Sequence, residues 1–110
     1  MSQRIKRINE LLKREVSQII LKEIDFYNIL VTITEVNTSS DLRQAKIKIS
    51  SLPQEKNELA LEIIKKNIFQ IQKEINKKLQ MNPIPRLVFE IDKTEIKAQR
   101  IEELLSKNKA

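Results

Sequence analysis

The residues of this chain whose types and spacing could do chemistry are basic, and the chemistry available to them is the binding of a polyanion. Lysine and arginine number 21 against 15 aspartate and glutamate residues, which gives a formal net charge of +6. Such an excess in a small domain favours a polyanionic partner, most simply nucleic acid. The candidate binding residues are Arg43, Lys46, Lys48, Lys65, Lys66, Lys73, Lys77, Lys78 and Arg86.

Three of these candidates have helical spacing. Lys66, Lys73 and Lys77 are separated by seven and four residues, so on a continuous helix they would fall within about one quadrant. We expect them to form a basic stripe. The competing interpretation is that each lysine is an ordinary solvated residue and that the positive charge is only compositional, and both interpretations stay open at this point.

Catalytic chemistry has few candidates in this sequence. The chain contains no His and no Cys, which removes the commonest general base, thiolate nucleophiles, disulfides and zinc fingers. It contains no Gly, so a phosphate-cradling loop of the Walker or dinucleotide type is not expected. Glu102 and Glu103 are adjacent and would diverge on a helix. We therefore expect a protein that is not an enzyme and has neither a cofactor nor a metal site.

Two strands are expected to carry the first group of cations. Residues 29–36 are rich in β-branched side chains, and residues 45–50 alternate strictly between apolar and polar positions. Ala45, Ile47 and Ile49 should face a core, which leaves the lysines between them on the opposite face. The polar link between the two strands predicts a hairpin.

Helices are expected on either side of this hairpin. Apolar residues at helical spacing predict one helix over residues 4–22 and a long one over residues 55–79. The second exceeds the usual length of a globular helix, and a break is expected near Asn67. Pro83 and Pro85 end it, and a third strand is expected over residues 87–92.

These elements predict a single α+β domain in the order helix, strand, strand, helix, helix, strand, with the helices packed on one face of a three-stranded sheet. The chain has 110 residues, enough for one core. We expect the domain to span residues 1–105, ending in a helical turn at 100–105, and residues 106–110 to form a flexible tail. No apolar run is long enough to cross a membrane and no secretion signal is evident, so we expect a cytoplasmic protein.

Three stretches of the sequence carry a resemblance to a known family. They are LVTITEVNTSSDLRQAKIKIS at residues 30–50, INKKLQMNPIPRLVFEID at residues 75–92 and RIEELL at residues 100–105. In this order and at these spacings they resemble the strand-loop-strand signature, the passage from helix to last strand, and the closing motif of the ribosome-binding factor A family. With the N-terminal helix, the resemblance covers nearly the whole chain.

The resemblance implies a type II KH-like fold with an interhelical kink at Asn67, Ile68 and Phe69. Family members have a small residue and a glycine at this kink, whereas this chain has no glycine there. Asn67 is expected to make the kink instead. Phe69 could fill the core or stack on a base, and we expect it in the core because aromatic residues are so scarce here. Asn28 stands where the family has another glycine, and Asn tolerates left-handed backbone geometry.

The resemblance also implies a function. A member of this family is expected to bind free or immature small (30S) ribosomal subunits through 16S rRNA and to assist late rRNA processing and assembly, with the basic residues named above as its rRNA-binding surface. We expect a monomer, and participation of a ribosome-assembly GTPase stays open. The alternative is a basic protein-interaction or dimerisation module without specific RNA binding.

Overall fold

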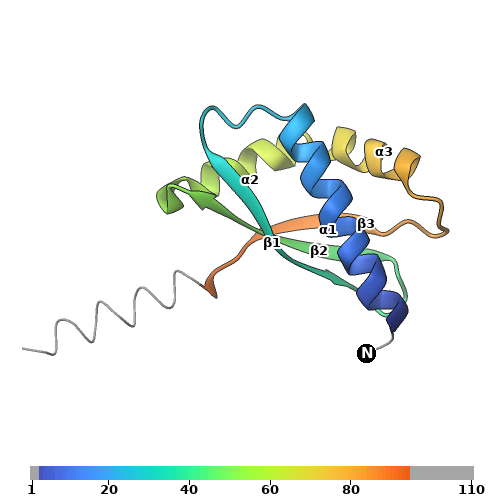
Figure 1. Cartoon of the computed structure of the whole chain (residues 1–110). Coiled ribbons are helices and arrows are strands. Elements are labelled where there is room, and N and C mark those ends of the chain that lie inside the picture. The colour runs from blue at the N-terminus through green and yellow to red at the C-terminus, as the bar shows by residue number, and fades with distance from the viewer. Residues whose placement is uncertain (1–2, 95–110) are drawn as a thin grey trace, which may run out of the picture.

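The computed structural model describes residues 3–94 (Figure 1), so the helical turn expected at 100–105 and the tail at 106–110 lie outside the described residues. The elements are α1 (Gln3–Glu23), β1 (Leu30–Thr38), β2 (Gln44–Leu52), a 3-10 helix η1 (Gln54–Lys56), α2 (Asn57–Lys66), α3 (Ile68–Lys78) and β3 (Arg86–Ile91). This order matches the order expected from the sequence.

The three strands form one sheet in the order β1-β2-β3. β1 and β2 form the expected antiparallel hairpin, whereas β2 and β3 run parallel because α2 and α3 return the chain to the same end of the sheet. Figure 1 shows α1 crossing the sheet, and side chains from all three α-helices join one core with the strands. No helix or strand among residues 3–94 packs on the other face of the sheet, which we call the open face. The α+β class and the helical layer on one face are therefore confirmed.

α1 packs on the sheet through the apolar stripe that its sequence predicts. Ile8, Leu12, Val16, Ile19 and Ile20 are buried and recur every three or four residues. This spacing places them on one side of the helix, where each meets the sheet or the other helices. Burying such side chains is the main favourable term in holding the helix to the domain.

β2 has the alternation expected of a half-buried strand. Ala45, Ile47 and Ile49 are almost completely buried, and the lysines between them face the open side. β1 departs from regular pairing at one point, because the register shifts between Ile33 and Glu35. This extra residue is typical of a β-bulge, which lets both ends of β1 keep their apolar residues on the core face.

The long helical stretch breaks at Asn67, as expected. α2 ends there with φ −107° and ψ 10°, the Asn67 N–H donates to Ile64 O over 2.9 Å, and its side-chain Nδ2 donates to Ile63 O over 2.8 Å. Because φ is negative, any L-residue can occupy this position, and the break needs no glycine.

Other turns of this glycine-free chain do use left-handed backbone. Tyr27, Asn28 and Leu42 have φ values of 52°, 71° and 62°. Asn28 adopts the geometry that its side chain tolerates, as expected, and Asp25 Oδ1 accepts the Tyr27 N–H over 2.8 Å. Leu42 keeps its strained backbone because its side chain is buried in the core.

Candidate nucleic-acid interface

Three of the predicted cations meet at one end of the sheet. β2 and β3 both begin there, and Arg86 N donates to Arg43 O over 2.9 Å. Arg86 pairs in register with Gln44, which is two residues from Lys46 on β2, so Lys46 and Arg86 share the open face. We call Arg43, Lys46 and Arg86 the hairpin-end cluster. All three side chains are exposed.

Lys48 lies on the same strand but in different surroundings. Its Nζ is 3.4 Å from Glu35 Oε2, and Glu90 is its register partner on β3. Asp92 follows at the end of β3, where the Thr34 hydroxyl, then the Thr94 amide and hydroxyl, and then the charge of Lys48 hold the pKa of its carboxyl at about 2. Carboxylates therefore surround Lys48, and its charge is less available to a phosphate than that of Lys46.

The basic stripe expected from helical spacing is not built on one helix. Lys66 ends α2, whereas Lys73 and Lys77 lie on α3, beyond the break at Asn67. A spacing argument that assumes one continuous helix cannot align residues across such a break. The prediction that these three lysines share a quadrant of one helix is therefore wrong in its premise.

The helical lysines also differ in their partners. Nζ of Lys66 lies 3.5 Å from Glu62, Nζ of Lys77 lies 3.9 Å from Glu74, and Nζ of Lys78 lies 3.7 Å from Glu15. These pairs are at least partly exposed, and such pairs contribute little to stability. Lys65 and Lys73 have no ion pair within residues 3–94. We call Lys65, Lys66 and Lys73, which all lie within four residues of Phe69, the junction cluster.

Phe69 does not fill the core, and the expectation that it would is wrong. Its side chain is 82% exposed. The reason is the angular position of Phe69 on α3. Ile71 and Ile75 form the buried side of that helix. Phe69 precedes Ile71 by two residues, roughly 200° around the helix axis, so it faces away from the sheet. Of the three residues at the kink, Asn67 and Ile68 are half-buried and Phe69 is presented to solvent.

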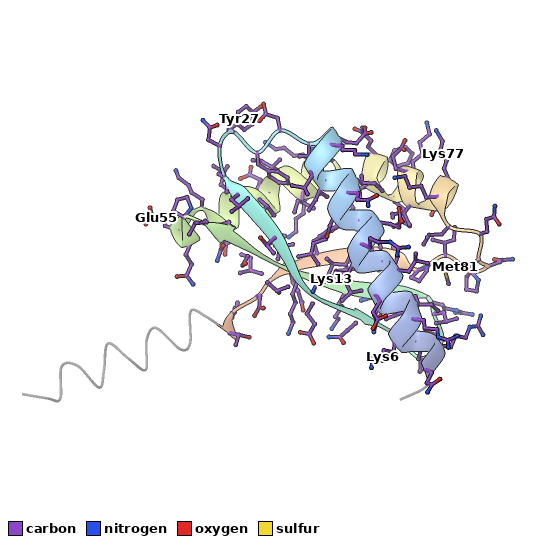
Figure 2. All side chains as sticks on the ribbon, viewed as in Figure 1. Lys6, Lys13, Tyr27, Glu55, Lys77 and Met81 are labelled. Atoms are coloured by element: carbon purple, nitrogen blue, oxygen red, sulfur yellow. The ribbon has the colours of Figure 1, made fainter. Side chains whose placement is uncertain are left out.

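Sequence reasoning missed part of the basic surface at the hairpin end. Asn9 Oδ1 accepts hydrogen bonds from Thr38 N over 2.9 Å and from Thr38 Oγ1 over 2.6 Å, which fixes the first turns of α1 beside the hairpin. Lys6 lies one turn before Asn9, and Figure 2 shows it near the start of α1. The sequence does show an excess of basic side chains in residues 4–22. It does not show which part of the sheet those side chains lie beside.

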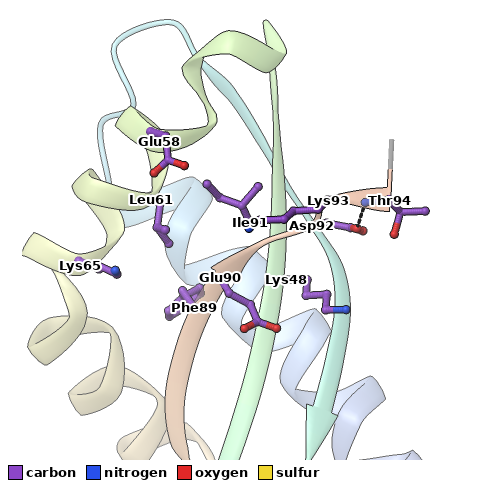
Figure 3. Close-up of a pocket in the computed structure, with 10 residues that line it drawn as sticks. All are labelled: Lys48, Glu58, Leu61, Lys65, Phe89, Glu90, Ile91, Asp92, Lys93 and Thr94. Atoms are coloured by element: carbon purple, nitrogen blue, oxygen red, sulfur yellow. Dashed lines mark hydrogen bonds between the residues drawn. The ribbon is translucent and has the colours of Figure 1, made fainter. Parts of the chain in front are cut away.

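An open groove of about 760 Å³ runs between α2 and β3, the outer strand of the sheet (Figure 3). Leu61 and Phe89 form part of its floor. Its charged residues balance in number, because three lysines and three carboxylates line it: Lys48, Lys65, Lys93, Glu58, Glu90 and Asp92. A balanced groove does not attract a polyanion as the hairpin-end cluster does.

Within residues 3–94 no group of His, Cys, Asp or Glu could hold a metal ion. None of the helices that the structure describes is long and apolar enough to cross a membrane.

Comparison with known proteins identifies a single family. The family model described as Ribosome-binding factor A matches residues 4–105. The ribosome-binding factor A of Clostridium botulinum strain Hall is 35% identical over 102 residues, covering 90% of this chain and 85% of that protein. That of Acetivibrio thermocellus is 35% identical over 111 residues, covering 98% of this chain and 90% of that protein.

Solved structures show the same fold. The crystal structure of ribosome-binding factor A from Thermus thermophilus matches with a TM-score of 0.70 at 20% identity, covering 79% of this chain and 93% of that one. The solution structure of a Thermotoga maritima protein described as a putative ribosome-binding factor A matches with a TM-score of 0.72 at 20% identity, covering 86% and 92%. A Thermus thermophilus homology model fitted into the cryo-EM map of a 30S complex matches with a TM-score of 0.64 at 21% identity, covering 76% and 90%.

Proposed function

Because this chain belongs to the ribosome-binding factor A family, we propose that it binds the small ribosomal subunit through 16S rRNA and assists late maturation of that subunit. It acts without catalysis, by binding. A factor that binds an immature rRNA conformation more tightly than the mature one shifts the population toward the form it prefers, and it leaves when maturation removes that form. One of the structural neighbours is a protein fitted into the map of a 30S complex, which supports the choice of subunit.

The observation that carries the proposal is the uneven placement of uncompensated cations. The hairpin-end cluster joins the starts of two strands, and Lys65 and Lys73 lie on either side of the helix junction without an ion pair in the described part of the chain. When such cations contact phosphates, the counterions condensed on the RNA are released. The binding affinity should therefore fall steeply as the salt concentration rises.

The test is co-sedimentation of the purified protein with isolated small and large subunits over a series of salt concentrations. We expect selective binding to the small subunit that falls as salt rises. The double variant Lys65→Glu with Lys73→Glu should weaken it at least tenfold, since two phosphate contacts become repulsive. The matched control, Lys22→Glu with Lys56→Glu, changes the net charge equally at exposed positions outside both clusters. Absence of small-subunit binding at low salt would overturn the proposal.

One observation favours the alternative of an interaction or dimerisation module. Leu30 and Leu52 are register partners at one end of the hairpin, and they are 56% and 67% exposed. Apolar side chains gathered on a surface can mark a protein contact. Sedimentation velocity over a hundredfold range of concentration separates the two functions. We expect a monomer throughout, whereas a dimer abolished by Leu52→Ser would support the alternative.

A further inference from the structure

Phe69 is the most exposed of the large apolar side chains that the structure describes, with 82% of its surface in water. The chain has only three Phe residues, and the other two, Phe26 and Phe89, are buried in the core. A Phe left in water forgoes the stabilisation that burial would give it. Core packing therefore does not explain why this position carries an aromatic ring.

The surroundings of Phe69 are positively charged. Lys65 and Lys66 form the last turn of α2, and Lys73 lies four residues after Phe69, on the same side of α3. Lys66 forms an ion pair with Glu62, whereas Lys65 and Lys73 have no carboxylate partner among residues 3–94. An exposed ring among cations suits a partner that is anionic and also has flat apolar faces.

From this combination we propose that Phe69 is a stacking platform for an unpaired base of RNA, and that the junction cluster binds the phosphates on either side of that base. Single-stranded nucleic acid is bound in this way by aromatic rings set among basic residues. This site rests on the proposed function. It adds that the bound RNA must offer an unpaired base. An acidic protein with an apolar pocket is the other occupant that the test must separate.

The break at Asn67 explains why the ring is available. Ile71 and Ile75 hold α3 to the core, and Asn67 ends α2 with side-chain and backbone hydrogen bonds to its own last turn. Phe69 is therefore fixed at the start of a packed helix while its ring stays free. A platform whose backbone is already ordered loses little conformational entropy when a base stacks on it.

The first test uses the absence of tryptophan from the chain. Phe69→Trp creates a single tryptophan at the proposed platform, and Leu52→Trp creates one at an exposed position at the end of β2. On titration with isolated small subunits, we expect strong quenching for Phe69→Trp and little change for Leu52→Trp. Equal responses from the two variants would overturn the proposal.

The second test compares Phe69→Ala, Phe69→Leu and Phe69→Tyr in small-subunit binding. Loss of a stacked base should weaken binding by about 5-fold to 150-fold in both Ala and Leu variants, while Tyr should bind as the wild type does. If Phe69→Leu binds like the wild type, the partner is an apolar protein pocket and the proposal is wrong. Thermal unfolding of each variant serves as the folding control, and an exposed position should tolerate all three changes.

The failures of the two proposals can be told apart. If wild-type protein does not bind small subunits, the proposed function fails. If wild-type protein binds and Phe69→Ala binds equally well, only the stacking platform is wrong. A single-stranded A12 oligoribonucleotide and a 12-base-pair RNA duplex provide the last comparison, since only the former should quench Phe69→Trp.

Discussion

At the scale of single residues, the most deeply buried polar side chain in the described fold is that of Asn57. It is buried at the start of α2, and its Oδ1 accepts hydrogen bonds from Ser51 N over 2.8 Å and from Ser51 Oγ over 2.6 Å. This contact ties α2 to the end of β2. A buried N–H left without a partner is more destabilising than a lost exposed hydrogen bond.

We therefore expect Asn57→Ala to lower the free energy of unfolding by about 2 kcal/mol, because the Ser51 N–H would be left buried without an acceptor. Ser51→Ala removes only the hydroxyl and keeps the backbone contact to Asn57, so its loss should be about half as large. Urea unfolding measures both. Equal losses for the two variants would contradict the role assigned to the backbone hydrogen bond.

Asp92 should make stability depend on pH. Its folded pKa of about 2 lies below the ordinary value of 3.8, owing first to the hydroxyl of Thr34 and then to the amide and hydroxyl of Thr94. A lowered carboxyl pKa contributes stability above pH 4, and this contribution is lost as pH falls through 2. Allowing for solvent screening at the surface, we expect Asp92→Asn to cost about 1 kcal/mol at pH 7.

Unfolding free energies of wild type and Asp92→Asn, measured from pH 7 down to pH 2, check this expectation. The difference between the two proteins should stay constant down to about pH 4 and shrink toward pH 2, where the protonated carboxyl resembles the amide. A difference that does not change over this range would mean that the variant acts through packing and not through charge.

Prediction of side-chain burial from the sequence succeeded where the apolar periodicity was unbroken. It failed across the break between α2 and α3. The alternation of Ala45, Ile47 and Ile49 correctly predicted a buried face, because one strand fixes the direction of each side chain. Phe69 was assigned to the core because aromatic residues are scarce. That argument rests on composition and does not say which way the side chain points. Its exposure follows from the phase of α3, which the sequence alone does not fix once Asn67 interrupts α2.

At the scale of elements, the side chain of Gln72 blocks the start of the outer edge of β3. Gln72 of α3 accepts the Leu87 N–H at Oε1 over 2.9 Å and donates from Nε2 to Pro85 O over 3.1 Å. The amide thus occupies two backbone groups at the start of the edge that a neighbouring strand would use. Edge strands present such groups to any other chain, and proteins commonly block them.

Gln72→Ala should lower the free energy of unfolding by about 1 to 2 kcal/mol and speed hydrogen exchange at the Leu87 amide, because that N–H loses its acceptor. Gln70→Ala is the matched control, since Gln70 is exposed and donates only to Glu23 over 3.1 Å. It should change stability by less than about 0.5 kcal/mol. Unchanged exchange at Leu87 in Gln72→Ala would show that the edge is protected in another way.

Element boundaries and the hairpin of β1 and β2 could be predicted to within a few residues, whereas the pairing of β3 could not. The strand expected at 45–50 extends over Gln44–Leu52, and the helix expected at 4–22 extends over Gln3–Glu23. The parallel pairing of β2 with β3 and the bulge between Ile33 and Glu35 depend on contacts between distant segments. Neither leaves a local pattern in the sequence.

At the scale of the whole molecule, net charge favours a polyanionic partner but does not give the layout of the charged surface. The formal charge of +6 is known from the sequence. The fold decides which cations remain uncompensated, by placing Glu35 against Lys48 and by leaving Lys73 without a partner among the described residues. Lys6 joins the hairpin end only because Asn9 bonds to Thr38, a contact between segments far apart in the chain.

This layout gives a last prediction about salt dependence. Binding of small subunits should follow a linear plot of log affinity against log salt, with a slope set by the number of phosphates contacted. Lys73→Gln removes an uncompensated charge and should reduce the magnitude of that slope by about 0.7 to 0.9. Lys48→Gln should leave the slope nearly unchanged, because Glu35 and the other carboxylates around Lys48 already neutralise its charge.

Both variants remove one positive charge, so a dependence on net charge alone would change both slopes equally. Equal slopes would mean that counterion release follows composition and that the two clusters have no special role. A smaller slope for Lys48→Gln than for Lys73→Gln would reverse the assignment and place the RNA at Lys48, in the middle of β2, and not at the helix junction. The predicted order instead requires the RNA to lie along the helix junction, where Phe69 is exposed and Lys65 and Lys73 have no carboxylate partner in the described chain.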